Sequence, residues 1–305
     1  MRGRTIATLV ELAQKDKNVV LITGDLGFGV LKPYWEAVPD QFLNAGIAEQ
    51  AMTGIAAGMA REGKTVFTYS IGNFPTLRCL EQIRNDCAYH GGDVKIICVG
   101  GGFVYGSLGM SHHATEDLSV MRALPDVTVL APGDADEAEA CVRAMYETKG
   151  TFYLRLGRGG EMQIRERPEP FAIGRALPVC SGERVAIFST GAIYDEVDGA
   201  ARRLRARGVN PAIYTFPTVK PIDRETVLRC AQDFAWIVTV EENTVVGGFG
   251  SAVAEVLAEA PKGARLLRIG LEDTYSCIVG SQKYLRDHYG MSAEKIAQRI
   301  EAALL

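Results

Sequence analysis

The sequence contains no apolar run near the roughly 18 residues that a membrane-spanning helix needs. Its N-terminus, MRGRTIATLVELAQKDKN, becomes charged too soon for a secretory signal peptide. Basic residues do not dominate either, because 33 Lys and Arg face 37 Asp and Glu, for a net charge of -4. These absences give no basis for a membrane or nucleic-acid partner.

Paired cysteine motifs are also missing. The seven cysteines are odd in number and irregularly spaced, and none forms a CxxC pair. This pattern is typical of reduced thiols rather than of a disulfide framework, and we expect a cytoplasmic protein. The adjacent His112 and His113 make a poor metal site, because neighbouring side chains point apart and no third ligand lies near them. We therefore predict no metal ligands in this chain.

The composition is that of a globular protein, with 305 residues, 47% of them hydrophobic and 23% charged. Short apolar runs alternate with helical patterns, which predicts α/β domains with mainly parallel sheets covered by helices on both faces. We predict two tandem domains, 1–160 and 181–305, joined by a linker at 161–180 that is rich in Gly, Pro and charge. The predicted strands are 19–24, 65–70, 94–101, 127–132, 151–157, 184–191, 210–216, 236–242 and 264–270. The predicted helices are 77–89, 134–148, 194–208, 223–233, 250–260 and 291–305, and 42–63 begins as a strand and becomes a helix.

Polar residues gather after several predicted strands, where ligands of parallel α/β domains bind. Asp25 lies in TGDLGFG, which lacks the spacing of a nucleotide loop and also suits a tight turn. Glu49 in NAGIAEQ suits proton exchange with a bound base, or is a helix N-terminal acid. His112 and His113 follow a glycine-rich stretch and are candidates for proton transfer or for structural roles. Arg155 and Arg158 in LRLGRGGE suit an anionic group, or are solvated charges.

Four segments in order resemble the pyrimidine-binding domain of transketolases: NAGIAEQAMTGIAAGMA, FTYSIGNFPTLRCLEQIRND, GSLGMSHHATEDLSVMRALPDVTVLAPGDADE and YLRLGR. TFPTVKPID and VTVEENTVVGGFGSAVAEVL resemble the C-terminal domain shared by transketolase, deoxyxylulose-phosphate synthase and the β subunits of 2-oxoacid dehydrogenases. The resemblance covers nearly the whole chain. It implies a thiamine-diphosphate enzyme that transfers a two-carbon ketol unit.

The resemblance also implies roles for single residues. Glu49 matches the glutamate that hydrogen-bonds the aminopyrimidine ring, and His112 a histidine that polarises the donor carbonyl. Phe74 matches the aromatic residue that stacks on the pyrimidine, Ile71 occupies the position of a second aromatic residue, and Asp25 matches an aspartate near the cofactor. Arg158 matches an arginine that binds the terminal phosphate of the substrate, and His113 is a second candidate for contact with the substrate.

Two departures concern the substrate. Family transketolases often have an acidic pair before the glycine of this loop, whose aspartate binds a sugar hydroxyl, and these positions are Ser107 and Leu108 here. A family histidine that helps to hold phosphate aligns near Gly100. Leu108 cannot accept a hydrogen bond, so we predict that ordinary pentose phosphates are poor substrates.

The chain also has no GDG, the motif with which the family holds Mg²⁺ and the diphosphate. We therefore expect a split enzyme in which a diphosphate-binding subunit supplies Mg²⁺ and its ligands, and an α₂β₂ assembly by analogy. Two alternatives stay open: a synthase or dehydrogenase β subunit that decarboxylates a 2-oxoacid, and a non-catalytic assembly subunit. The sequences EQIRND and LSVMRALPD favour transketolase.

Overall fold

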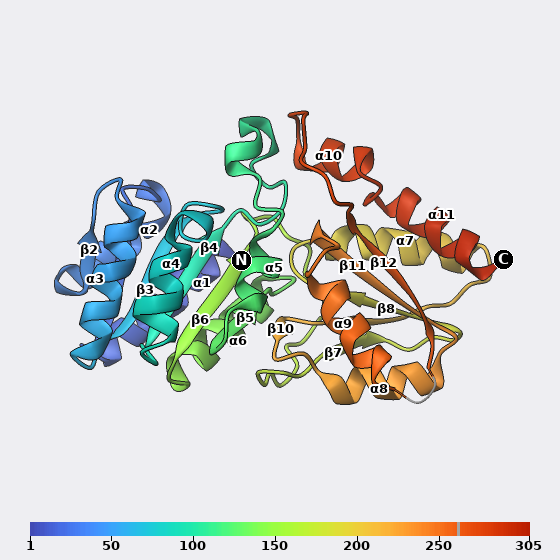
Figure 1. The fold of residues 1–305 in the computed structure, drawn as a ribbon, viewed down its shortest axis with the longest axis horizontal. Helices are drawn as coiled ribbons and strands as arrows, with labels where there is room; N and C mark the ends of the chain where they lie inside the picture. The colour runs from blue at the N-terminus through green and yellow to red at the C-terminus, as the bar shows by residue number, and fades with distance from the viewer. Residues whose placement is uncertain (261–262) are drawn as a thin grey trace.

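A computed structural model describes residues 1–260 and 263–305 as two α/β units that lie side by side (Figure 1). The first unit is a seven-stranded sheet in the order β10-β5-β6-β4-β3-β1-β2, parallel except for β10. The second is a five-stranded sheet in the order β12-β11-β8-β9-β7, parallel except for β7. The predicted fold class, two tandem domains with mainly parallel sheets, is confirmed.

The strands of the first sheet are short apolar runs. Strand β1, VVLIT, is buried along its whole length, as expected for a parallel strand covered on both faces. The bounds of the first-sheet strands are β1 Val19–Thr23, β2 Phe42–Asn44, β3 Thr65–Ile71, β4 Val94–Val99, β5 Val127–Leu130, β6 Thr151–Leu156 and β10 Thr218–Lys220. The helices of this unit are α1 Arg2–Lys15, α2 Phe28–Ala37, α3 Glu49–Arg61, α4 Leu80–Gln82, α5 Asp117–Ala123 and α6 Ala135–Glu147.

The second unit follows the same plan. Its strands are β7 Leu177–Cys180, β8 Val185–Ser189, β9 Ala212–Thr215, β11 Trp236–Thr244 and β12 Arg265–Leu271. Its helices are α7 Tyr194–Ala206, α8 Arg224–Asp233, α9 Phe249–Ala258, α10 Gln282–His288 and α11 Ala293–Leu304. No helix in the described part of the chain has the length and apolar character needed to cross a membrane.

One hydrophobic core runs through both units. Helices α1, α2 and α6 cover one face of the first sheet, and α3 and α5 cover the other. This second layer continues into α8 and α9 of the second unit, where Phe216 packs on Phe188 and Phe249 at ring distances of 4.7 and 5.1 Å. Burial of this shared apolar surface fixes the two units relative to each other.

One strand crosses the boundary between the two units. Strand β10, which follows β9 in the chain, leaves the second unit and pairs antiparallel with β5, with Thr218 opposite Leu130. Strand β7 occupies the last four residues of the predicted linker and pairs with β9. Some elements of the structure differ from the prediction. Helices α1, α2, α5 and α10 and strands β7 and β10 were not predicted, and the predicted helix 77–89 is a sequence of 3₁₀, α and π turns.

Candidate functional site

The predicted site residues follow adjacent strands of the first sheet. Asp25 follows β1, Glu49 follows β2, Phe74 follows β3, His112 follows β4 and Arg158 follows β6. These strands are parallel neighbours, so their carboxyl ends meet at one edge of the sheet. The fold thus brings together residues that are more than a hundred positions apart in the sequence.

Glu49 is the first residue of helix α3 and is 3% exposed. Its Oε2 lies 2.7 Å from Nη1 of Arg78, a residue that the sequence did not single out. The loop after β1 approaches the side chain closely, since a Cβ on Gly24 would lie 3.4 Å from Glu49 Cγ. A buried carboxylate at a helix N-terminus is favoured by the helix dipole, and here it also has a cationic partner.

Phe74 lies between Arg78 and His112. The Arg78 guanidinium is 4.6 Å from the centroid of the Phe74 ring, and the His112 ring is 5.1 Å from it on an edge-to-face geometry of 71°. The Glu49 carboxylate and the Phe74 ring together suit a flat, nitrogen-containing ring, because the carboxylate can bind a ring nitrogen while the aromatic ring packs on the ring face. The pyrimidine implied by the resemblance is such a ring. Arg78 lies four residues after Phe74 in the segment FTYSIGNFPTLRCLEQIRND, and this position in a family-like segment is the signal that could have found it.

The two adjacent histidines differ in their surroundings. His112 is half-buried, and its Nδ1 lies 3.0 Å from the Ser111 hydroxyl. Burial, and then the neighbouring His113 ring, lower the pKa of His112 from its ordinary 6.5, so the neutral form of the ring predominates at pH 7. His113 is buried, its Nε2 lies 3.1 Å from the Gly106 carbonyl, and its ring packs on Phe103. The structure therefore places His112 in the site and His113 in the wall behind it.

Tyr105, which the sequence did not indicate, connects His112 to Arg158. Its ring centroid is 6.4 Å from that of His112, and the Arg158 guanidinium lies 5.8 Å from the Tyr105 ring. Gly100 has φ +92°, and a Cβ there would lie 2.2 Å from Tyr105 Cε2. The ring of Tyr105 thus fills the space that a side chain at position 100 would need.

Arg158 is exposed at the border of the two units. It lines a cavity of about 190 Å³ together with Gly159, Tyr194, Gln282 and Arg286. Within the described residues it forms no ion pair, so its guanidinium has free donors for an anionic group.

Three other predicted residues are less central. Asp25 has φ +57°, and its backbone N–H and carboxylate form a reciprocal pair with the Asn44 amide at 3.0 and 2.9 Å. Ile71 ends β3, and its carbonyl accepts from the Phe74 N–H at 2.9 Å. Leu108 is 55% exposed and lies in a single 3₁₀ turn, where its backbone N–H donates to the Tyr105 carbonyl.

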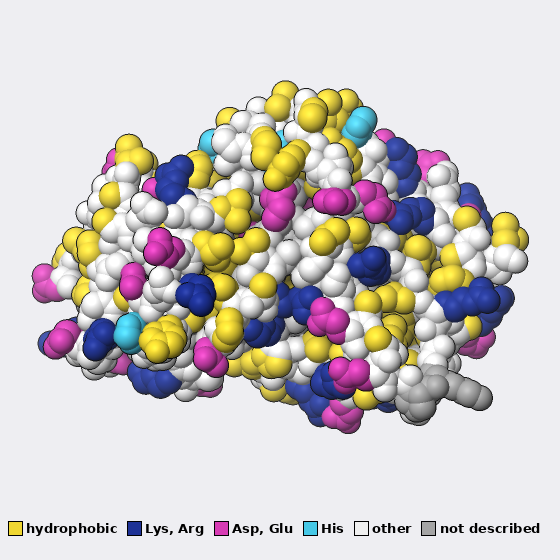
Figure 2. Space-filling model, viewed as in Figure 1, with side chains coloured by type: hydrophobic (Ala, Val, Ile, Leu, Met, Phe, Trp, Pro, Cys, Tyr) yellow, Lys and Arg dark blue, Asp and Glu magenta, His cyan; other side chains and the backbone are white. Residues whose placement is uncertain are grey.

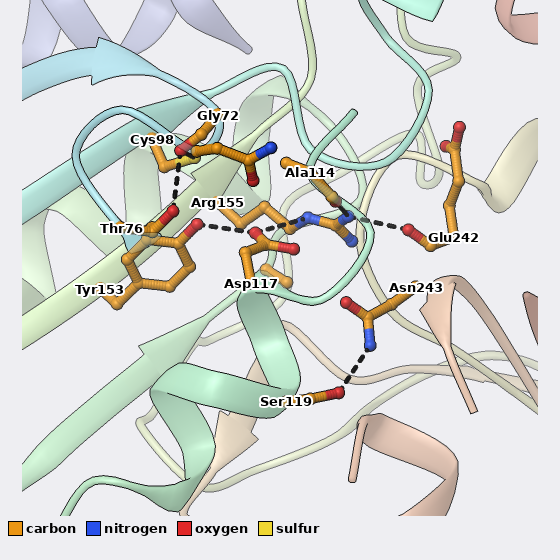
Figure 3. A network of polar contacts seen from close by, with 12 residues as sticks. Gly72, Thr76, Cys98, Ala114, Asp117, Ser119, Tyr153, Arg155, Glu242 and Asn243 are labelled. Atoms are coloured by element: carbon orange, nitrogen blue, oxygen red, sulfur yellow. Dashed lines mark hydrogen bonds and ion pairs between the residues drawn. The ribbon is translucent and has the colours of Figure 1, made fainter. Parts of the chain in front are cut away.

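Arg155, predicted with Arg158 as an anion-binding candidate, is buried and is held by an ion pair and two hydrogen bonds (Figure 3). It lies 3.1 Å from Asp117, and its Nη2 donates to the carbonyls of Ala114 and Glu242, each at 2.8 Å. Tyr153 donates to the same Asp117 at 2.6 Å. Its Nη2 holds the end of the His112 loop against the second unit, so we assign this buried arginine a structural role.

No three His, Cys, Asp or Glu side chains among residues 1–260 and 263–305 gather closely enough to hold a metal ion.

Comparisons with known proteins agree with this layout. The profile of the transketolase pyrimidine-binding domain matches residues 4–160, and that of the transketolase C-terminal domain matches residues 174–296. One of the subunits of the apulose-4-phosphate transketolase of Phocaeicola vulgatus is 34% identical over 95% of this chain and 93% of its own length. A 6-deoxy-6-sulfo-D-fructose transketolase subunit of a Clostridium species is 34% identical, over 98% and 92%. A solved split-gene transketolase, described as an inactive β₄ tetramer, superposes with a TM-score of 0.88 at 34% identity, over 99% of this chain and 97% of that one.

Proposed function

The chain belongs to the transketolase family, and on that premise we propose that it is the β-type subunit of a split transketolase. With its partner it transfers a two-carbon ketol unit from a ketose to an aldehyde. The observation that carries this function is the placement of Glu49, Phe74 and His112 at one sheet edge, with Arg158 beyond them. A non-catalytic assembly subunit would not need this arrangement.

Each residue of this edge has a chemical task. Thiamine diphosphate would supply the carbanion and the electron sink of the reaction. Glu49 would hold and return a proton at the carboxylate oxygen that faces the pyrimidine nitrogen, and Phe74 would pack on the ring. The neutral His112 ring would donate a hydrogen bond to the oxygen of the ketose carbonyl, where negative charge develops. Arg158 would bind the anionic end of the sugar.

The partner subunit would hold the diphosphate and Mg²⁺. Support for a partner comes from exposed apolar side chains near the site. Figure 2 shows hydrophobic side chains gathered at the top of the molecule, where the 105–113 loop and the segment before α10 rise together in Figure 1. The two segments are joined by a hydrogen bond from Gly280 N–H to the Gly106 carbonyl, and both carry exposed apolar residues, including Leu108, Met110, Tyr275 and Val279. Exposed patches of this kind mark interaction surfaces, and an α₂β₂ assembly in the cytoplasm is our working arrangement.

The substrate would be a modified sugar with an anionic end. The relatives named above act on apulose 4-phosphate and on 6-deoxy-6-sulfo-D-fructose. Leu108 offers no acceptor for a sugar hydroxyl, and the Tyr105 ring takes the space above Gly100. These two residues, Leu108 and Tyr105, favour the binding of sugars whose hydroxyl pattern differs from that of the ordinary pentose phosphates. The phosphate or sulfonate of such a sugar would bind to Arg158.

The first experiment is calorimetric titration of thiamine diphosphate with Mg²⁺ into the chain alone and into its mixture with the partner subunit. We expect binding only in the mixture, and tight binding by the chain alone would contradict the split arrangement. Turnover of xylulose 5-phosphate is then compared with that of 6-deoxy-6-sulfofructose and apulose 4-phosphate. Preferential use of the pentose phosphate would refute the substrate proposal, and decarboxylation of pyruvate without ketol transfer would favour the 2-oxoacid alternative.

A further inference from the structure

Arg78 contacts both residues that the proposed function assigns to the pyrimidine ring. Its Nη1 lies 2.7 Å from Glu49 Oε2, and its Cζ lies 4.6 Å from the centroid of the Phe74 ring. Its backbone N–H donates to the Asn73 carbonyl at 3.3 Å, so the side chain starts from a fixed turn. One side chain therefore joins the acid to the aromatic ring.

The ion pair uses only half of the carboxylate. The Glu49 side chain is 4% exposed, whereas the Arg78 side chain is 47% exposed. Glu49 Oε2 is engaged by Arg78, but Oε1 accepts no hydrogen bond from any described residue and is not sealed from solvent. A buried carboxylate that keeps one accessible, unused oxygen is incomplete without a ligand.

A carboxylate is free to rotate about its last side-chain torsion, which has broad minima. A guanidinium bound to one oxygen restricts this rotation, and stacking on Phe74 restricts the guanidinium itself. The free oxygen is then held in place before the ligand arrives, which lowers the entropy lost on binding.

We propose that Arg78 is a positioning residue for the cofactor: it holds Glu49 through Oε2, so that Oε1 is the oxygen that meets the pyrimidine nitrogen. The inference rests on the proposed function and adds a residue to it. The Arg78 side chain is 47% exposed and Glu49 Oε1 is open to solvent, so we expect the loss of Arg78 to cost the fold less than the loss of an arginine from a fully buried pair.

The test uses the two-subunit complex and measures affinity rather than activity. Thiamine diphosphate is titrated with Mg²⁺ into the wild-type, R78M and R78K complexes. The titration is repeated with the analogue in which the ring nitrogen facing Glu49 is replaced by C–H. We expect R78M to bind thiamine diphosphate roughly tenfold more weakly and the analogue nearly unchanged, so that discrimination between them falls by the same factor. R78K, which keeps the charge without the planar stacking group, should lie between R78M and wild type.

A matched control is R224M, because Arg224 pairs with Glu259 on an exposed surface at 2.6 Å. R224M should leave both affinities unchanged. Unchanged binding by R78M would overturn the proposal, and tighter binding would show that Arg78 competes with the ring. An equal loss for cofactor and analogue would mean that Arg78 acts elsewhere than at the ring nitrogen. A wild-type complex that does not bind thiamine diphosphate would instead refute the proposed function.

Discussion

Two arginine–carboxylate pairs lie near the carboxyl edge of the first sheet, and they are built differently. In the Arg155–Asp117 pair the side chains are 4% and 0% exposed, and Arg155 also donates to two carbonyls. In the Arg78–Glu49 pair the arginine is half-exposed, and one carboxylate oxygen has no partner among the described residues. Asp117 Oδ1 also has no hydrogen-bond partner among the described residues, but it is buried away from solvent, whereas Glu49 Oε1 is accessible. Only the second pair therefore has an acceptor that a ligand can reach.

The accessibility of unused hydrogen-bonding atoms distinguishes a structural arginine or carboxylate from a ligand-binding one better than the residue type does. The residue pattern alone offered both Arg155 and Arg158 for anion binding, and the resemblance assigned that role to Arg158. In the structure, the burial and partners of Arg155 make it a support for the His112 loop, whereas Arg158 remains exposed with free donors. Unused hydrogen-bonding capacity at an accessible position is the feature that marks a binding group.

The largest effect on activity is expected at the Arg78–Glu49 pair. E49Q removes the proton that Glu49 exchanges but keeps the size of the side chain, so kcat/KM of the two-subunit complex should fall at least about 100-fold. The unfolding midpoint should stay close to that of wild type. Steady-state transketolase assays and denaturant unfolding check both expectations, and unchanged activity would favour the non-catalytic alternative.

The buried pair should respond in stability. R155M leaves Asp117 buried without its charge partner, and we expect a loss of about 3–5 kcal/mol in the free energy of unfolding. Urea unfolding measures the loss, and R224M, on an exposed pair, should lose less than about 1 kcal/mol. Equal losses in the two variants would remove the distinction between the pairs.

A third variant tests whether the substrate-binding part of the site includes Tyr105. In G100A the new Cβ overlaps the Tyr105 ring, which must then leave its present position beside His112 and Arg158. We expect kcat/KM for the sugar donor to fall roughly tenfold to a hundredfold, with thiamine diphosphate affinity unchanged. G63A is the control, since Gly63 also has a positive φ, +88°, but its Cβ would meet no atom within 4 Å. A parallel loss of cofactor affinity in G100A would place Tyr105 in the cofactor site instead.

The smallest effect concerns a buried carboxylate that has no arginine paired with it among the described residues. Burial raises the pKa of Glu241 from its ordinary 4.5 to about 7, although the N–H groups of Phe249 and Gly250 donate to it. Between these two pH values the folded state binds more protons than the unfolded state, so this group's contribution to stability falls as pH rises from 4.5 to 7. The slope is at most about 1.4 kcal/mol per pH unit. Unfolding of wild type and E241Q at pH 5, 6 and 7 should show a wild-type advantage that shrinks with pH, and a constant difference would contradict the shift.

Much of this molecule follows from its sequence pattern. Parallel strands buried on both faces are continuous apolar runs, so β1, β3, β4 and β6 could be predicted with their order along the chain. Glu49, Phe74, His112 and Arg158 were indicated by the resemblance, and the structure brings them to one edge. Whether they act as the resemblance implies stays a prediction.

Other features depend on contacts between distant segments, which the pattern does not contain. The approach of Arg78 to Glu49 requires that the turn after β3 pack against α3. The inward position of Arg155 depends on Asp117 and on Glu242 from the other unit. Strand β10 has only three residues, too few for a periodic signal, and its partner lies about ninety residues earlier.

Strand β10 has a consequence for the evolution of such proteins. Because Thr218–Lys220 completes the first sheet, a gene that encoded residues 1–160 alone would leave the edge of β5 unpaired. An exposed edge of this kind promotes aggregation. The two halves are therefore poor candidates for free domain shuffling, because recombination that exchanges the second half must preserve this three-residue strand.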